Sequence, residues 1–233
     1  TAGIRCLRIH DGKLYSASND STIKIWNCST NALIATLTGH AHGVKCLELH
    51  GGKVYSGSFD YTIKIWNCST NALITTLTGH THGVYCLEFH DGKVYSGDFQ
   101  GEIKVWNDSN HELITTLGVP DEGEGDENSE NVNEGHTHWV RCLTAHDGKL
   151  YSSSHDKTIK IWNCSDRKLI ATLTEHTGWV GCLTIHGGKL YSGSEDHTIK
   201  VWNCSTNELI KTLEEHNGVV YRLTIHGSKL YSG

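Results

Sequence analysis

The chain lacks the features that mark several large classes of protein. It has no methionine, a single proline and no apolar run long enough to span a membrane. No signal-like segment opens it, and no segment keeps the apolar period of a helix. Its nine cysteines form no Cys-x-x-Cys pair and no Cys/His set at zinc spacing. These absences argue against a membrane, helical or zinc-binding protein, and we expect no metal and no cofactor.

A basic surface is also missing. The net charge is −6, and residues 121–134 alone carry seven acidic side chains. The rest of the chain is therefore close to neutral, without the positive footprint that nucleic-acid binding requires. We expect neither nucleic acid nor a membrane among the partners.

The cysteines that are present fall into two periodic classes. Five lie in the first predicted strand of a repeat, at positions 6, 46, 86, 142 and 182. The other four follow a Trp-Asn pair, at positions 28, 68, 164 and 204. An odd number in a once-per-repeat pattern favours reduced, mostly buried thiols, which are typical of the cytoplasm or nucleus. The sequence Asn-Cys-Ser at Asn27, Asn67, Asn163 and Asn203 leaves an alternative open, since it would be glycosylated in a secreted chain.

The chain is built from repeats. Tryptophans spaced by 40, 40, 56 and 40 residues mark five similar units, at Trp26, Trp66, Trp106, Trp162 and Trp202. Each unit has four short runs rich in Val, Ile, Leu, Tyr and Thr, and Asp-Gly or Gly-Gly pairs predict tight hairpins between the first two. Four antiparallel strands in about 40 residues are typical of one blade of a β-propeller. The sequence thus predicts an all-β propeller with five full repeats and a half repeat.

The units resemble WD repeats. Gly-His, Ser-Gly-Ser-x-Asp and Ile-Lys-Ile-Trp occur at the spacing of that family over nearly the whole chain. The resemblance implies a hydrogen-bonded tetrad of His, Ser, Asp and Trp within each blade. Residue by residue, it implies three complete tetrads: His40, Ser56, Asp60 and Trp66; His136, Ser152, Asp156 and Trp162; and His176, Ser192, Asp196 and Trp202.

Two units depart from that pattern. The first has Ser16, Asp20 and Trp26, but its histidine would precede Thr1. The third has His80, Ser96 and Trp106, with Gln100 at the position of the aspartate. Because glutamine supplies no carboxylate, the sequence predicts a weakened tetrad there and a gain in stability from Gln100→Asp. Asparagine follows each of the five repeat tryptophans where the family has aspartate, which does not affect the tetrads.

Function should lie where the repeats diverge. One such place is an acidic loop between blades, residues 118–135, which accounts for the long spacing. It is either an arm that recruits a basic partner or a tolerated insertion, and the sequence leaves both readings open.

The second place is the set of connections beside the first and second strands. Exposed aromatic side chains often mark recognition surfaces. The predicted partner-binding face comprises Phe59, Phe99, Trp139, Arg141, His155, Trp179 and Glu195. Alternatively, the two tryptophans are buried under neighbouring segments. A convergence of His42, His82 and His138 on a metal is the less favoured reading, because they belong to separate blades.

The functional prediction is a non-enzymatic scaffold or substrate-recruiting adaptor for protein or peptide partners. The short hairpins resemble the propellers of myosin heavy chain kinases and of TRAF- or F-box-type ubiquitin ligases. Alternatives are a purely structural assembly subunit or an enzyme that uses the central channel. Residues 1–233 are interpreted as a single WD-repeat domain or a fragment of one, in a ring of six or seven blades closed by further sequence or by a second copy.

Overall fold

The computed structural model describes residues 2–119 and 134–233. Within these ranges all regular structure is β-strand, and no helix long and apolar enough to cross a membrane occurs. The chain divides into two compact units, residues 1–99 with 104–115 and residues 100–103 with 116–233. The acidic loop predicted at 118–135 lies, apart from its ends, outside the described residues. The prediction of a single domain stays a prediction.

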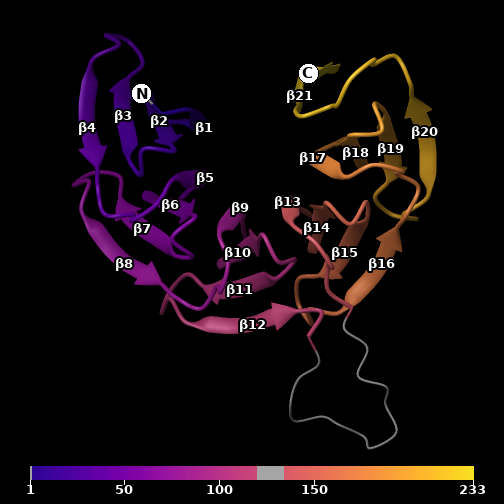
Figure 1. Cartoon of the computed structure of the whole chain (residues 1–233), viewed down its shortest axis with the longest axis horizontal. Helices are drawn as coiled ribbons and strands as arrows, with labels where there is room; N and C mark the ends of the chain where they lie inside the picture. The colour runs from indigo at the N-terminus through magenta and orange to yellow at the C-terminus, as the bar shows by residue number, and fades with distance from the viewer. Residues whose placement is uncertain (1, 120–133) are drawn as a thin grey trace, which may run out of the picture. The chain divides into compact units, whose positions relative to one another are not determined.

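Three four-stranded antiparallel sheets, which we call blades one to three, occupy the first part of the chain (Figure 1). Their strands follow one another in chain order across each sheet: β1 (Ile4–His10), β2 (Lys13–Ser18), β3 (Ile23–Asn27) and β4 (Leu33–Leu37); β5 (Val44–His50), β6 (Lys53–Ser58), β7 (Ile63–Asn67) and β8 (Leu73–Leu77); β9 (Val84–His90), β10 (Lys93–Asp98), β11 (Ile103–Asn107) and β12 (Leu113–Leu117). The boundary between the two units passes through blade three.

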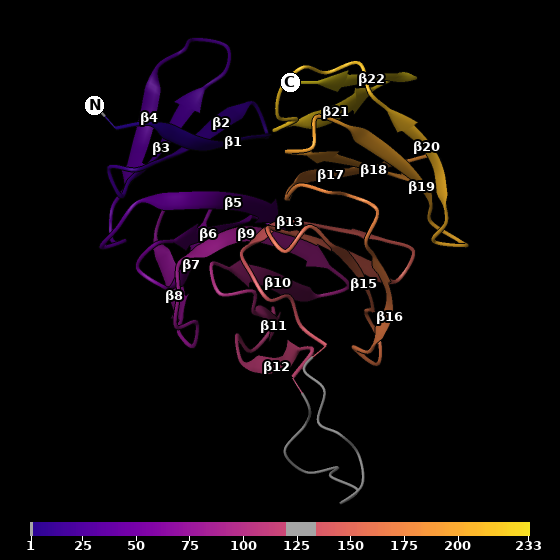
Figure 2. The same ribbon diagram turned by 45° about the vertical axis from the view of Figure 1, so that its right-hand side comes forward.

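The second unit adds two full blades and a two-stranded sheet. Their strands are β13 (Val140–His146), β14 (Lys149–Ser154), β15 (Ile159–Asn163) and β16 (Leu169–Leu173); β17 (Val180–His186), β18 (Lys189–Ser194), β19 (Ile199–Asn203) and β20 (Leu209–Leu213); and β21 (Leu223–His226) with β22 (Lys229–Ser232). Figure 2 shows β21 beside β17, with which it is in contact. The all-β prediction of five full repeats and a half repeat is confirmed.

Tight turns set the register of each blade. In blade one His10 pairs with Lys13, so the connection holds only Asp11 and Gly12, and both have positive φ (47° and 69°). Positive φ at both central residues is the geometry that asparagine, aspartate and glycine tolerate best, and it matches the twist of a hairpin. The equivalent turns recur before β6, β10, β14 and β18, which confirms the hairpins expected from Asp-Gly and Gly-Gly.

The core of each unit lies between consecutive blades. In the first unit β1 packs on β5 and β5 on β9. Val44 and Leu47 of β5 are fully buried in a cluster with Tyr15 and Ile25 of blade one. In the second unit Val180 and Leu183 of β17 pack in the same way against Tyr151 of blade four. A blade therefore buries its apolar faces only against its neighbours, as repeat architectures require.

The predicted tetrads form. In blade two His40 Nδ1 lies 2.7 Å from Asp60 Oδ2, His40 Nε2 lies 2.8 Å from Ser56 Oγ, and Trp66 Nε1–H donates to the same hydroxyl at 2.9 Å. Burial lowers the pKa of His40 despite its hydrogen bond to Asp60. A neutral imidazole that donates from Nδ1 and accepts from the serine hydroxyl at Nε2 leaves no member of the network unmet.

Blades four and five repeat this geometry. His136 and His176 contact their aspartates at 2.8 and 2.7 Å and their serines at 2.7 and 2.8 Å. Trp162 and Trp202 each donate to the serine at 2.9 Å. In blade one Trp26 donates to Ser16 at 3.0 Å, and Asp20 accepts from the backbone and hydroxyl of Thr22.

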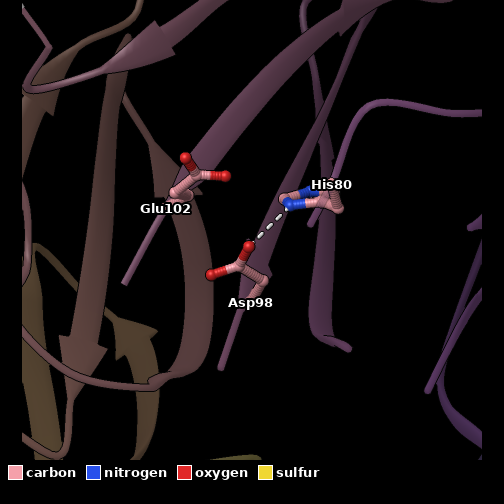
Figure 3. A group of neighbouring side chains, drawn as sticks. All are labelled: His80, Asp98 and Glu102. Atoms are coloured by element: carbon pink, nitrogen blue, oxygen red, sulfur yellow. Dashed lines mark hydrogen bonds and ion pairs between the residues drawn. The ribbon is translucent and has the colours of Figure 1, made fainter. Parts of the chain in front are cut away.

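The prediction of a weakened tetrad in blade three is wrong. His80 Nδ1 lies 2.9 Å from Asp98 Oδ2, and His80 Nε2 lies 2.6 Å from Ser96 Oγ, to which Trp106 donates at 2.8 Å. Figure 3 shows the Asp98 carboxylate turned toward the His80 ring. Asp98 occupies the position of Ser58 in blade two, two residues before the expected aspartate. The carboxylate has therefore moved along the chain while its contact with the histidine is kept.

The asparagine after each tetrad tryptophan also has a structural role. Asn67 Oδ1 accepts hydrogen bonds from the backbone N–H groups of Ser69 and Thr70 at 2.8 and 2.9 Å. Asn27 and Asn203 bind their turns in the same way. Such side-chain turns are made by aspartate and asparagine alike, which explains why either residue can follow the tryptophan.

We expect Asp98→Ser to lower the free energy of unfolding by roughly 1–3 kcal/mol, because the buried His80 N–H would lose its acceptor. The double variant Asp98→Ser/Gln100→Asp gives blade three the Ser and Asp of blade two and should recover most of this loss. Urea titrations followed by tryptophan fluorescence measure both effects. Gln100→Asp alone should bring no gain, and a rise in stability from that change would contradict the Asp98 assignment.

Acid should weaken the tetrads in two steps. Burial would raise the pKa of Asp196, but hydrogen bonds from Thr198 and His176 outweigh it and lower that pKa to about 2. The pKa of His176 is lowered by burial. The unfolded chain therefore takes up protons before the folded chain does, first at histidine below a pH of about 6.5 and then at aspartate below about 3.9.

The free energy of unfolding should accordingly fall as the pH drops through each of these windows. Denaturant titrations between pH 8 and pH 3 test this. His176→Gln should flatten the first step, whereas the same change at the exposed His186 of β17 should leave it in place. Equal slopes for both variants would exclude the assignment.

Candidate partner-binding sites

A β-bulge recurs at the start of the first strand of every full blade. In blade one Ile4 pairs with Ser18 and Cys6 with Ala17, so Arg5 is an extra residue without a ladder partner. The extra residues of the following blades are Lys45, Tyr85, Arg141 and Gly181. Bulges redirect side chains and are frequent beside functional sites. The repeat thus presents one variable side chain per blade at a fixed place.

In the first unit these side chains meet the first residue of the connection between the second and third strands. Arg5 Nε and Lys45 Nζ both donate to Asn19 Oδ1 at 3.0 Å. Lys45 Nζ also lies 3.8 Å from the centre of the Phe59 ring. Phe59 contacts Phe99 with ring centres 4.9 Å apart.

Tyr85 continues the series, since its ring meets that of Phe99 edge-on at 5.3 Å. We call the series Arg5, Asn19, Lys45, Phe59, Phe99 and Tyr85 the first-unit row. It begins with two cations and ends with three aromatic rings. Its members come from three successive blades of the repeat.

The second unit has a row of its own. The rings of His155 and Trp179 are stacked at 5.1 Å with an interplanar angle of 3°. Trp139 lies 4.7 Å from His155, and the Arg141 guanidinium lies 4.7 Å from the Trp179 ring. We call Trp139, Arg141, His155, Trp179 and Tyr221 the second-unit row, because Tyr221 contacts Trp179 at 5.7 Å.

The predicted face residues are found in these rows with one exception. Phe59 and Phe99 contact each other in the first unit, and Trp139, Arg141, His155 and Trp179 contact one another in the second. Both tryptophans are half-buried, so neither of the two readings of them holds in full. Glu195 is exposed and joins no ring contact, although its charge acts on His155.

The sequence pattern did not indicate Arg5 and Tyr221 as members of the face. Both occupy the same position of the repeat as Lys45 and Arg141, although Tyr221 precedes its strand β21, and an alignment of the units at that position would have found them. One of the three histidines considered for a metal site, His138, has other contacts. Its Nδ1 accepts the Trp139 N–H at 2.9 Å, and its ring stacks on that of His155.

Electrostatics distinguish the two rows. Burial, with the nearby charges of Arg141 and His138, lowers the pKa of His155 to about 4, so the second-unit row holds a neutral imidazole between two indoles. In the first-unit row burial and the positive charge of Arg5 lower the pKa of Lys45 to about 8. Lys45 is therefore partly withdrawn from solvent and lies beside a second cation.

The Ser–His–Asp trios do not have the access that hydrolysis needs. Ser56, Ser96, Ser152 and Ser192 have no exposed surface, and each already receives a tryptophan N–H. A nucleophile must reach a substrate carbonyl, so the trios act as structural networks. In the same way, both ring nitrogens of His80 are occupied by Asp98 and Ser96 and have no lone pair left for a metal.

Five successive antiparallel blades, of which blades two to five contain the complete network, define a repeat protein of the β-propeller class. The sequence model of the "WD domain, G-beta repeat" family matches residues 1–27, 31–67, 71–107, 128–163 and 167–203. The chain belongs to the WD-repeat family.

Solved structures agree with this class. The crystal structure of the computationally designed Ika8 protein is similar at 28% sequence identity with a TM-score of 0.85, over 99% of this chain and 68% of that one. None of the curated proteins matches the chain. Since 1610 chains of solved structures match, the fold by itself does not narrow the function, which depends on the residues of the two rows.

Burial and the charge of Arg5 should make Lys45 titrate near pH 8, well below an ordinary lysine. Arg5→Gln should raise the pKa of Lys45 by removing a positive charge, and Asn19→Asp should raise it further by placing a carboxylate at the shared acceptor. Side-chain NMR of lysines labelled at Cε measures both shifts. Arg8→Gln, on the same strand but paired with Glu48, is the control and should change little. A Lys45 pKa above 10 in the wild type would contradict the geometry.

Proposed function

We propose that this chain is a non-enzymatic interaction scaffold that captures protein or peptide partners through the two rows. The observation that supports this is the division of labour within the repeat. The residues that the blades share are buried in tetrads and cores, whereas the residues that differ gather into continuous series of aromatic and cationic side chains. Aromatic residues and arginine are the side chains that contribute most to protein interfaces.

The finer role is that of a substrate-recruiting adaptor. WD repeats are generally protein-interaction scaffolds, and the short hairpins resemble those of propellers attached to myosin heavy chain kinases and to TRAF- or F-box-type ubiquitin ligases. Such an adaptor selects a partner and leaves the chemistry to another domain. Nine cysteines outside any disulfide, seven of them buried, support a location in the cytoplasm or nucleus. The near-neutral charge outside residues 121–134 supports protein partners over nucleic acid.

A second candidate is a structural subunit that assembles through its fourth strands. These strands begin with a Leu-Ile pair, and several of the pairs are exposed on both residues: Leu33 and Ile34, Leu73 and Ile74, and Leu209 and Ile210. Exposed apolar residues on unpaired strand edges favour association with other chains.

Completion of the repeats is part of the proposal. Ile4 and Leu7 of β1 are each 54% exposed, whereas their counterparts Val44 and Leu47 in β5 are fully buried by blade one. A face of this kind fits another blade, supplied by further sequence or by a second copy in a ring of six or seven.

Capture experiments separate the two candidates. We expect the triple variant Phe59→Ala/Trp139→Ala/Trp179→Ala to lose partners that the wild type recovers from cell extracts, while the tetrads keep the fold intact. The control is Ile34→Ala/Ile74→Ala/Ile210→Ala, which removes exposed apolar side chains from the fourth strands. Quantitative mass spectrometry of the recovered proteins, with circular dichroism for the fold, gives the answer. Loss in the control alone would favour the assembly role.

A further inference from the structure

The cationic end of the first-unit row lacks counter-charge. Arg5 and Lys45 share one neutral amide oxygen, that of Asn19, and neither forms an ion pair with a carboxylate among the residues that the structure describes. Other cations of the same unit do find one. Arg8 pairs with Glu48 at 3.4 Å, and Lys53 pairs with Asp108 at 2.9 Å.

The backbone fixes the positions of the two cations. Both are bulge residues, so their direction is set by the backbone of β1 and β5. Gly43 lets the chain approach Asn19 closely, since a Cβ there would lie 3.0 Å from Asn19 Cα and 3.1 Å from its Oδ1. The equivalent residues in blades four and five are Trp139 and Trp179, which could not approach in this way.

The aromatic end is held open by a second glycine. A Cβ on Gly83 would lie 2.5 Å from the Phe59 ring and 3.1 Å from the Phe99 ring. The two phenyl rings therefore lean over the backbone before β9. Phe59 remains partly exposed, with Lys45 against its face. A ligand whose negative charge pairs with the Lys45 ammonium would therefore also contact the apolar Phe59 ring.

We propose that the first-unit row binds an acidic peptide segment, with an aspartate or glutamate carboxylate held by Arg5 and Lys45 and a neighbouring apolar side chain packed on Phe59 and Phe99. The inference deepens the proposed scaffold function and rests on it. Charge complementarity selects the carboxylate, because Arg5 and Lys45 carry further N–H donors beside the one that each gives to Asn19 Oδ1, and a carboxylate would accept from them with a full negative charge. The adjoining rings select a peptide over a small free anion, since an anion alone would leave them unused.

Binding should also act back on the site. A carboxylate beside Lys45 offsets the repulsion by Arg5, so the peptide should raise the pKa of Lys45 above its value of about 8 in the free protein. The groups that face this ammonium are Arg5 from β1, Asn19 from the connection after β2, and Phe59 from the connection after β6. No other charged group is in contact with it among the described residues.

The test uses the full chain and the acetylated, amidated peptide Gly-Ser-Glu-Leu-Gly-Ser, titrated by NMR with detection of the Lys45 side chain. We expect saturable binding, with roughly tenfold weaker affinity for Gln in place of Glu and for the variants Arg5→Gln or Lys45→Gln. Gly in place of Leu in the peptide, or Phe59→Ala in the protein, should also weaken binding. Arg8→Gln should bind like the wild type.

Each alternative outcome is decisive. Equal affinity for the Gln and Glu peptides, or the absence of binding to both at millimolar concentration, would overturn the carboxylate site while leaving partner capture by the second-unit row unaffected. A phosphoserine-Leu peptide bound more than ten times as tightly as Glu-Leu would reassign the site to phosphate. Inorganic phosphate or acetate that binds as tightly as the peptide would overturn the role of the rings.

Discussion

The four-membered network of histidine, serine, carboxylate and tryptophan is the interaction on which blades two to five depend. Its polar groups are buried, and each would cost about 1–3 kcal/mol if left without a hydrogen-bond partner, so the loss of one member exposes the others to that cost. The network joins the segment before the first strand to the second and third strands, and through the carboxylate it fixes the connection between them. Blade three shows what is constrained: the carboxylate must reach His80, but Asp98 can supply it from a different position.

The residues that the blades share form this network and the cores between blades. The remaining positions are therefore free to vary. The first-unit row combines cations with phenyl rings, whereas the second-unit row is dominated by indoles and neutral imidazole. Two rows of different chemistry on one scaffold would suit partners with different anchors, or one partner with several. The free energy that holds the scaffold and the residues that recognise a partner are thus largely separate.

The sequence was sufficient for the fold because the signals for it repeat. The tight turn that Asp11 and Gly12 form in the first unit is predicted in all five units, by an Asp-Gly or a Gly-Gly pair. The tryptophan spacing alone defines the length of the unit. The misjudged position was Gln100, since a family pattern assigns the carboxylate to a fixed place and does not register that Asp98 reaches the same nitrogen. Geometry of that kind depends on side-chain direction, which a pattern does not contain.

The candidate site was only partly predictable. Aromatic residues at divergent positions led to Phe59, Trp139 and Trp179, but nothing in the sequence indicated that Arg5 and Lys45 converge on Asn19 from different blades. That convergence follows from the packing of β1 on β5 and from a bulge, which moves one side chain out of the alternation that a strand would otherwise impose.

The bulge has a consequence for how the sequence of such a protein can diverge during evolution. A residue outside the hydrogen-bonded ladder can be exchanged without shifting the register of any strand, and arginine, lysine, tyrosine and glycine all occupy it in this one chain. Duplication of a blade therefore copies a stable framework together with one bulge position whose residue can change to give a new binding specificity. Diversification can proceed blade by blade, and new recognition properties can be acquired with little risk to folding.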